Sequence, residues 1–272
     1  MRHVAQRPSG EAFENWSQKA REASLALVRS WEIAHESAES GERTPDWAPS
    51  IDERLYKELR QIFLFDAFHK KCAYCEANAS ANYAVQVEHY RPKAAVTQGR
   101  KSTAHPGYFW LAYEWWNLLL SCAYCNTDHT DPIREKSHPG KKNEFPVRRE
   151  RVQAPTGDPD QWLGSLNEEE ALLLNPYFDH PEQHIDFQPE TGMAVSLDER
   201  GRATIEICDL NRPSLCERRL ELRSESLPVM ILKLMNHPRD LVIQPDMEFT
   251  MWRGRLLQSK TRELNEKAGA PG

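Results

Sequence analysis

Two short repeats, Cys72-Ala-Tyr-Cys75 and Cys122-Ala-Tyr-Cys125, enclose the segment of the chain that decides its fold. Each Cys-x-x-Cys pair places two thiols on one tight turn, and a single tetrahedral zinc ion can join two such turns that are distant in sequence. We therefore expect Cys72, Cys75, Cys122 and Cys125 to bind one structural Zn²⁺. This closed site would contribute folding free energy to a small ββα unit that has little core of its own.

The residues between the two cysteine pairs include those that a metal-dependent phosphodiesterase needs. Alternation over residues 84–87 predicts a strand, and Pro92 ends its ladder just after Glu88-His89. Phosphodiester hydrolysis needs a general base for the attacking water and a hard cation for the charge on the departing oxygen. His89 is the candidate base because imidazole titrates near neutral pH.

Two further side chains supply oxygen atoms for a catalytic cation or hold the site together. The Glu88 carboxylate and the Asn126 amide offer the oxygen donors that Mg²⁺ or Mn²⁺ prefers, whereas soft thiolates select Zn²⁺. Asn117 precedes the hydrophobic run that leads to the second cysteine pair. We expect it to be a hydrogen-bonding brace for the loop that carries His89. The sequence thus predicts two metal sites with separate roles.

The composition is that of an ordinary globular protein. The chain has 272 residues, 39% hydrophobic and 28% charged, and could form one large domain or two modest ones. The start lacks the apolar stretch of a signal peptide, and the most apolar later run, residues 227–235, is short and contains Lys233. We expect a cytoplasmic protein that does not enter the membrane. Thiols stay reduced in the cytoplasm, so metal ligation is favoured over disulfides. Cys208 and Cys216 are not part of the predicted metal site and are expected to be small buried hydrophobic residues.

Basic residues gather beside the predicted site although the formal net charge is −6 at pH 7. That charge argues against a nucleic-acid-binding surface over the whole chain, but binding depends on the local potential. We expect Arg91, Lys93, Lys141 and Lys142 to contact nucleic acid; the alternative is that each basic run is a solvated face. Other basic residues follow in the same two stretches, at Arg100, Lys101, Arg148, Arg149 and Arg151.

The core segment, residues 71–152, is expected to lie between two flanking regions. In the N-terminal region, residues 1–70, apolar spacings of three and four after Ser9 predict an amphipathic helix, and Ser50-Ile-Asp-Glu53 is a capping-box pattern that opens a second. The dense aromatic run at 108–116 is expected in the core rather than at a stacking surface. Residues 153–160, rich in Pro, Gly and Asp, are the best linker candidate.

The C-terminal region, residues 161–272, is predicted to be mainly helical with one β-hairpin. Residues 192–197 and 203–207 flank Asp198-Glu-Arg-Gly201 as the two strands of that hairpin. Helices are expected after Pro213, with breaks at Pro228 and Pro238, and over residues 247–264. Within the core, residues 127–140 are interpreted as an insertion loop, and its histidines, His129 and His138, as bystanders.

Taken in order, these motifs resemble an HNH endonuclease of the ββα-metal type with zinc-binding cysteine pairs. More closely, they resemble the PtuB-like family, which are the HNH effectors of Septu and related retron anti-phage systems. The segments that carry this resemblance are Lys71-Cys-Ala-Tyr-Cys-Glu76, Val87-Glu-His-Tyr-Arg-Pro-Lys93, Trp116-Asn-Leu-Leu-Leu-Ser-Cys122, Phe145-Pro146, Leu174-Asn-Pro176, and Leu210-Asn-Arg212 with Leu215 and Arg219. The resemblance covers most of the chain from Leu55 to about Leu220.

The resemblance implies a role for each residue of the site and a partner for the protein. It makes His89 the general base, Glu88 and Asn126 the ligands of the catalytic metal, and Asn117 the residue that orders the hairpin. It also implies a PtuA-like ATPase partner. Most HNH enzymes have Asp and His where this chain has Glu88 and Asn126. The resemblance also implies a lysine that faces the phosphate, and the candidates for this role are Lys136, Lys141 and Lys142.

The expected fold class is therefore α+β, with a ββα-metal (HNH) nuclease core and a four-cysteine zinc site between N-terminal helices and a mainly helical C-terminal region containing a β-hairpin. The expected function is metal-dependent hydrolysis of DNA phosphodiester bonds in anti-phage defence. A second interpretation is a zinc-stabilised module that binds nucleic acid or an ATPase partner without cutting. A third is an RNA substrate, because nothing in the motifs reads the 2′-hydroxyl or a base edge.

Overall fold

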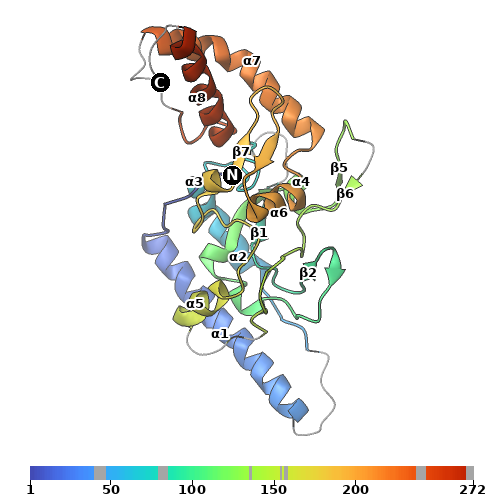
Figure 1. Cartoon of the computed structure of the whole chain (residues 1–272). Helices are drawn as coiled ribbons and strands as arrows, with labels where there is room; N and C mark the ends of the chain where they lie inside the picture. Colours follow the sequence, from blue (N-terminus) through green and yellow to red (C-terminus); the bar gives the residue numbers. More distant parts are fainter. Residues whose placement is uncertain are drawn as a thin grey trace.

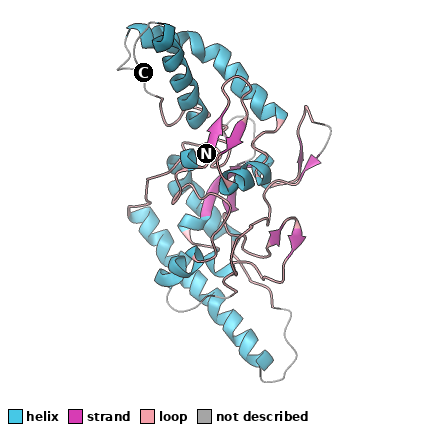
Figure 2. Cartoon of the chain, viewed as in Figure 1, coloured by secondary structure: helices cyan, strands magenta, loops and turns pink. Residues whose placement is uncertain are grey.

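A computed structural model describes residues 1–39, 47–78, 85–134, 137–153, 155, 159–236 and 243–267 of the chain. Helices and short antiparallel strand pairs are mixed along it, which confirms the predicted α+β class (Figures 1 and 2). Ala84, Lys136, Pro238 and part of the predicted linker lie outside the described residues. The division into three regions stays a prediction.

The N-terminal region is built on one long helix, α1 (Glu11–Glu39). Its apolar stripe buries Trp16, Ala20 and Leu27, as the spacing predicts. The indole Nε1 of Trp16 donates to the Leu55 carbonyl at 2.8 Å and ties α1 to the next helix. In Figure 1, α1 extends from the body of the molecule at the end opposite to α7 and α8.

The second helix, α2 (Glu53–Leu59), continues through one π-helical turn, η1 (Arg60–Leu64), into α3 (Phe65–Ala67). Its N-cap is Asp52, whose carboxylate accepts from the Arg54 amide at 2.9 Å, so the helix begins after Asp52 and is not capped by Ser50. The continuous helical path brings the chain directly to the first cysteine pair.

The central element is an antiparallel pair of strands, β1 (Val85–His89) and β4 (Leu118–Cys122), followed by the one-turn helix α4 (Ala123–Asn126). The register places Val85 opposite Cys122 and His89 opposite Leu118. All five residues of β4 are buried. The Ala73 amide donates to the Leu120 carbonyl at 2.7 Å, so the first cysteine turn lies against the edge of β4.

Short elements connect these parts. The described chain contains the strand pairs β2 (Thr97–Gln98) with β3 (Lys101–Ser102) and β5 (His129–Thr130) with β6 (Ser137–His138). It also contains α5 (Trp162–Asn167) and the 3₁₀ turns η2 (Phe109–Leu111), η3 (Trp115–Asn117), η4 (Pro159–Gln161) and η5 (Pro181–Gln183). The aromatic run around η2 is in the core, with Tyr108, Phe109 and Trp110 buried.

The C-terminal region has a β-hairpin, but the strand assignment from the sequence was wrong. Strand β8 (Ala194–Ser196) pairs with the upstream strand β7 (Ile185–Phe187), and residues 203–207 belong to α6 (Glu199–Ile207). Asp198, interpreted as the start of a turn, is the N-cap of α6 and accepts from the Gly201 amide at 2.8 Å. A cap and burial of the Ile205 face stabilise a helix where β-branched residues also suited a strand.

Two longer helices complete the described chain, α7 (Pro213–Asn236) and α8 (Thr250–Lys267). The predicted break at Pro228 was wrong, because α7 continues through it. Proline inside a helix removes one backbone donor and clashes with the preceding turn, but these effects do not end α7 at Pro228. Across all the described helices, none combines the length and the apolar character that a bilayer-spanning segment requires.

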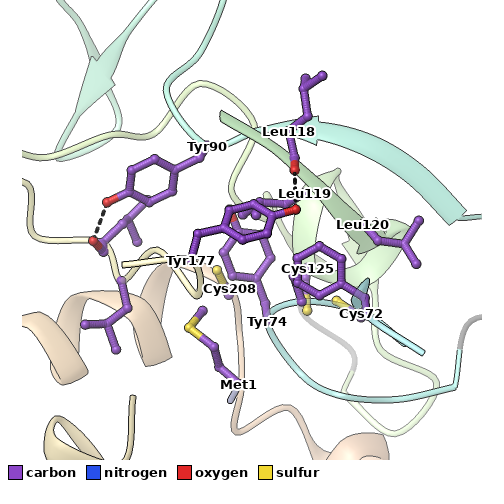
Figure 3. Packing of buried hydrophobic residues seen from close by; sticks show 14 of the residues in the cluster. Met1, Cys72, Tyr74, Tyr90, Leu118, Leu119, Leu120, Cys125, Tyr177 and Cys208 are labelled. Atoms are coloured by element: carbon purple, nitrogen blue, oxygen red, sulfur yellow. Dashed lines mark hydrogen bonds between the residues drawn. The ribbon is translucent and has the colours of Figure 1, made fainter. Parts of the chain in front are cut away.

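One hydrophobic core joins residues from the beginning to the end of the chain. Met1, Tyr74, Leu119 and Cys208 lie close together in it (Figure 3). The hydroxyl of Tyr177 donates to the Leu118 carbonyl at 3.2 Å and links the C-terminal region to β4 (Figure 3). The strands that carry the candidate site are therefore supported by both flanking regions.

Candidate metal centre and active site

The four cysteines predicted to share an ion are brought together by the fold. All four are buried, and their sulfur atoms lie within 4.8 Å of one another. The Cys75 and Cys122 sulfurs are 3.8 Å apart, which is about the separation that a tetrahedral site with Zn–S bonds of roughly 2.3 Å produces. Cys72 and Cys75 come from the turn after α3, and Cys122 and Cys125 from the junction of β4 and α4. The cluster could bind a structural zinc ion.

His89 is the last residue of β1, and its ring is fixed by a backbone contact. The Nε2 atom lies 3.0 Å from the Ala112 carbonyl oxygen, so this nitrogen is the donor and Nδ1 keeps its lone pair. The Tyr56 ring packs edge-on against the imidazole at 4.7 Å. Burial, and then the Lys93 ammonium, lower the pKa of His89 to about 3. The imidazole is therefore neutral near pH 7; because a general base works best with a pKa near the working pH, this low pKa makes the ring a weak proton acceptor in this state.

Glu88 precedes His89 and carries the carboxylate of the site. Its Oε1 atom accepts from the Nζ atom of Lys141 at 2.5 Å, and the same ammonium also donates to the His89 carbonyl at 3.0 Å. Burial raises the pKa of Glu88, while the charge and the hydrogen bond of Lys141 oppose that rise. Lys141 is completely buried, so it partners the carboxylate inside the protein and is not on the surface.

Asn126 ends α4 and faces the same strand. Its Nδ2 donates to Gln86 Oε1 at 2.8 Å, and its amide is close enough to Glu88 to lower the pKa of that carboxyl. Its Oδ1 atom is buried and accepts no hydrogen bond from the described residues. A buried polar atom without a partner is costly, and an oxygen of this kind beside a carboxylate suits a hydrated Mg²⁺ or Mn²⁺.

Asn117 is the last residue of η3, directly before β4. Its Oδ1 accepts from the Arg91 amide at 2.8 Å, and its Nδ2 donates to the Arg91 and Leu111 carbonyls at 3.2 and 3.1 Å. These bonds hold the backbone after His89 and the segment before the Ala112 carbonyl. Asn117 thus joins the two segments that orient the His89 ring, without approaching solvent itself.

The four basic residues predicted to contact nucleic acid occupy different environments. Arg91 and Lys141 are buried and have protein partners. Lys93 is partly buried, and its Nζ donates to the Tyr56 hydroxyl at 2.8 Å. Lys142 is exposed and pairs with the exposed Asp128. Only Lys93 and Lys142 of this set have positions from which a phosphate could be reached.

Arg91 forms a buried ion pair with Glu169, and its guanidinium packs against the rings of Tyr108 and Phe145. We expect Glu169→Gln to lower the free energy of unfolding by about 3 kcal/mol, because it leaves the Arg91 charge buried without its counter-ion. Urea denaturation followed by tryptophan fluorescence measures this. The neighbouring residue Glu170 is only partly buried and offers a control, since Glu170→Gln removes its pair with the exposed Arg149 and should cost less than about 1 kcal/mol. Equal effects would contradict the assignment.

A second group of ligand-type side chains, His129, His138 and Asp209, also lies within 4.8 Å. Arg134 donates to both oxygens of Asp209, at 2.8 and 3.0 Å, and His129 Nε2 lies 3.2 Å from the same carboxylate. The two nitrogens of His138 contact the Gly140 amide and the Glu206 carbonyl. The hydrogen-bonding groups of these side chains already have protein partners. The cluster therefore links His129, Arg134 and His138 to the residues at the end of α6. The two histidines are structural rather than bystanders.

Sequence reasoning missed several residues of the site. Gln86 was detectable, because alternation along a strand puts it on the same face as Glu88. Tyr56 and the Ala112 carbonyl carried no local signal, and neither did Arg212, whose guanidinium contacts the sulfurs of Cys75 and Cys125. Each of these reaches the site only through tertiary packing.

Comparison with known proteins identifies relatives of the chain, although no family model matches it. Septu protein PtuB of Bacillus mycoides (strain KBAB4) is 33% identical over 214 residues, which are 74% of this chain and 64% of that protein. Septu protein PtuA of the same strain is 30% identical over 168 residues, which are 61% of this chain and 21% of that protein. The chain thus spans just under two thirds of PtuB and about a fifth of PtuA. The chain is therefore homologous to Septu protein PtuB over about three quarters of its own length.

Proposed function

We propose that the protein is a metal-dependent HNH endonuclease that hydrolyses DNA phosphodiester bonds. One observation carries the proposal: the buried carboxylate of Glu88 lies close to the Asn126 amide, whose oxygen has no hydrogen-bond partner among the described residues, and the next residue, His89, carries a neutral imidazole oriented by the Ala112 carbonyl. A general base and oxygen donors for a cation are the two requirements of this chemistry. The order of β1, β4 and α4 supports the proposal, because a ββα unit needs two strands followed by a helix.

The protein's own residues divide the work of the reaction. His89 would take the proton of the attacking water at Nδ1, because Nε2 is held by the Ala112 carbonyl. Glu88 and Asn126 would hold the cation, which supplies charge stabilisation for the departing oxygen when bound. Lys141 places a positive charge against Glu88 and is positioned to keep that carboxylate ionised. Tyr56 covers the imidazole and limits its motion.

We further propose that the cysteine cluster binds structural Zn²⁺ and that the protein acts in anti-phage defence with a PtuA-type ATPase. Homology to two Septu proteins of one strain supports the defence role. The PtuA match supports the association, because a segment homologous to this chain lies within that longer protein. Incubation of supercoiled plasmid with the purified protein and Mg²⁺ or Mn²⁺, with and without the ATPase, tests the activity. A parallel digestion of labelled RNA decides the substrate, and cleavage of RNA alone would contradict a DNase.

Lys142 offers a test of the nucleic-acid surface. Its ion pair with Asp128 is exposed and therefore weak, so the ammonium can exchange that partner for a phosphate. We expect Lys142→Gln to reduce the slope of log K against log salt for duplex DNA by about 1, the loss of roughly one phosphate contact. Fluorescence anisotropy over a salt series measures the slope. Lys19→Gln, on the exposed face of α1, is the control, and an equal change in both variants would contradict the assignment.

A further inference from the structure

Arg212 lies in the turn between α6 and α7, and its side chain extends into the cysteine cluster. One guanidinium nitrogen lies 3.7 Å from the Cys125 sulfur and the other 3.7 Å from the Cys75 sulfur. The first nitrogen also donates to the Asp209 carbonyl at 3.2 Å. The guanidinium lies over the Tyr124 ring at 5.2 Å. Arg212 is 3% exposed, so water does not solvate this charge to any extent.

A buried guanidinium needs a negative partner, because transfer of a charge out of water is costly unless it is paired and hydrogen-bonded. Among the described residues, no carboxylate lies within ion-pair distance of Arg212; the groups that it contacts are sulfur atoms, a carbonyl and a ring. Four neutral thiols would leave the charge uncompensated. Four thiolates around one Zn²⁺ leave two excess negative charges, and a guanidinium in contact with two of the sulfurs balances one of them.

The turn that carries Arg212 is held from its other side by residues 127–140. Arg134 pairs with Asp209, three residues before Arg212, and Asp131 accepts from the Ser214 amide two residues after it. The segment 127–140 begins two residues after the last cysteine of the cluster, and it returns to fix the turn whose arginine faces the sulfurs. This arrangement ties the C-terminal helices to the metal cluster.

We propose that Arg212 is a positioning residue of the zinc site, which donates to the Cys75 and Cys125 thiolates, neutralises part of the cluster's charge and anchors the α6–α7 turn to it. The inference rests on the proposed zinc site. Hydrogen bonds and a positive charge offset the excess negative charge of the four thiolates around the ion, so we expect the metal to be released more slowly. Outer contacts of this kind are worth about 10- to 100-fold in metal affinity.

The test compares Arg212→Gln and Arg212→Lys with the wild-type protein. We expect R212Q to lose zinc to a chromogenic chelator about 10- to 100-fold faster, and R212K, which keeps the charge with one donor group, to lie between. In the Co²⁺-substituted protein, R212Q should shift the sulfur-to-cobalt charge-transfer bands to lower energy, because the thiolates become stronger donors. Arg200→Gln is the control: it breaks a partly buried pair between α6 and Asp179, remote from sulfur, and should leave both readouts unchanged.

The outcomes separate the two proposals. Wild-type protein that purifies without zinc and does not bind Co²⁺ through sulfur would contradict the zinc site itself. Stoichiometric zinc in the wild type, with R212Q and R212K showing the wild-type release rate and cobalt spectrum, would overturn the role of Arg212 alone. An equal acceleration in R200Q would also overturn it, since general destabilisation would then explain the effect. If R212Q does not fold, the R212K spectrum and release rate decide.

Discussion

Replacing His89 with glutamine is expected to lower the rate of metal-dependent plasmid nicking by about two to four orders of magnitude, the usual contribution of a general base. Glutamine has no group that can take a proton from water, but its amide can still donate toward the Ala112 carbonyl that Nε2 now contacts. The loss should therefore appear in the rate and not in the fold. Agarose-gel nicking assays with Mg²⁺ or Mn²⁺ measure it, and circular dichroism checks the structure.

His105 provides a matched control for this substitution. It is also buried, its Nε2 lies 2.8 Å from the Val152 carbonyl, and burial likewise lowers its pKa. Its second ring nitrogen, Nδ1, accepts from the Gly107 amide at 3.1 Å, so it is not available as a base. His105→Gln should keep the wild-type nicking rate. Wild-type nicking by H89Q, or an equal loss in H105Q, would remove His89 as the base.

Loss of the zinc ligands is expected to unfold the central part of the protein. Structural zinc sites supply apparent binding free energies of about 10–16 kcal/mol, which is at least as large as the whole stability of a typical domain. Cys75→Ser should abolish stoichiometric zinc and the cooperative thermal transition. Elemental analysis and differential scanning calorimetry measure the two effects.

Cys216→Ser is the control for this prediction. Cys216 is partly buried and is not a member of the four-sulfur cluster. We expect C216S to keep one zinc per chain and a melting temperature within a few degrees of wild type, because a Cys-to-Ser change at a site without metal costs roughly 1 kcal/mol. A well-folded C75S protein with unchanged zinc would contradict the shared site.

The features predicted best from the sequence are those set by local chemistry. The two Cys-x-x-Cys turns carry their own ligand geometry, and the apolar spacing of α1 follows from helical periodicity. Glu88 and His89 adjoin in sequence, so the proximity of their backbones was certain, although successive side chains of a strand point to opposite faces. The chain brings Asn126 to the same place because Cys122 and Cys125 fix the end of β4 and the start of α4. Local constraints of this kind can be recognised in the sequence without knowledge of the tertiary fold.

What could not be predicted depends on contacts between distant residues. Arg91 is separated from Glu169 by 78 positions, and nothing in its neighbourhood shows that it is buried. Lys141 pairs with a carboxylate 53 positions away, which distinguishes it from Lys142 only in three dimensions. Residues 203–207 satisfy both a strand and a helix pattern, and Asp198 as an N-cap decides for the helix. In each case the local sequence is compatible with two structures or environments, and tertiary contacts determine which one forms.

The central claim is that Glu88, His89 and Asn126 form one cation-dependent hydrolytic centre beside a separate zinc cluster. Anomalous X-ray diffraction from crystals soaked in Mn²⁺ tests it most directly, with data collected at the zinc and manganese absorption edges. We predict a zinc peak among the four cysteine sulfurs and a manganese peak in contact with the Glu88 carboxylate and Asn126 Oδ1, with His89 Nδ1 facing the same space. Absence of manganese at Glu88, with zinc present at the cysteines, would contradict the nuclease and leave a zinc-stabilised binding module.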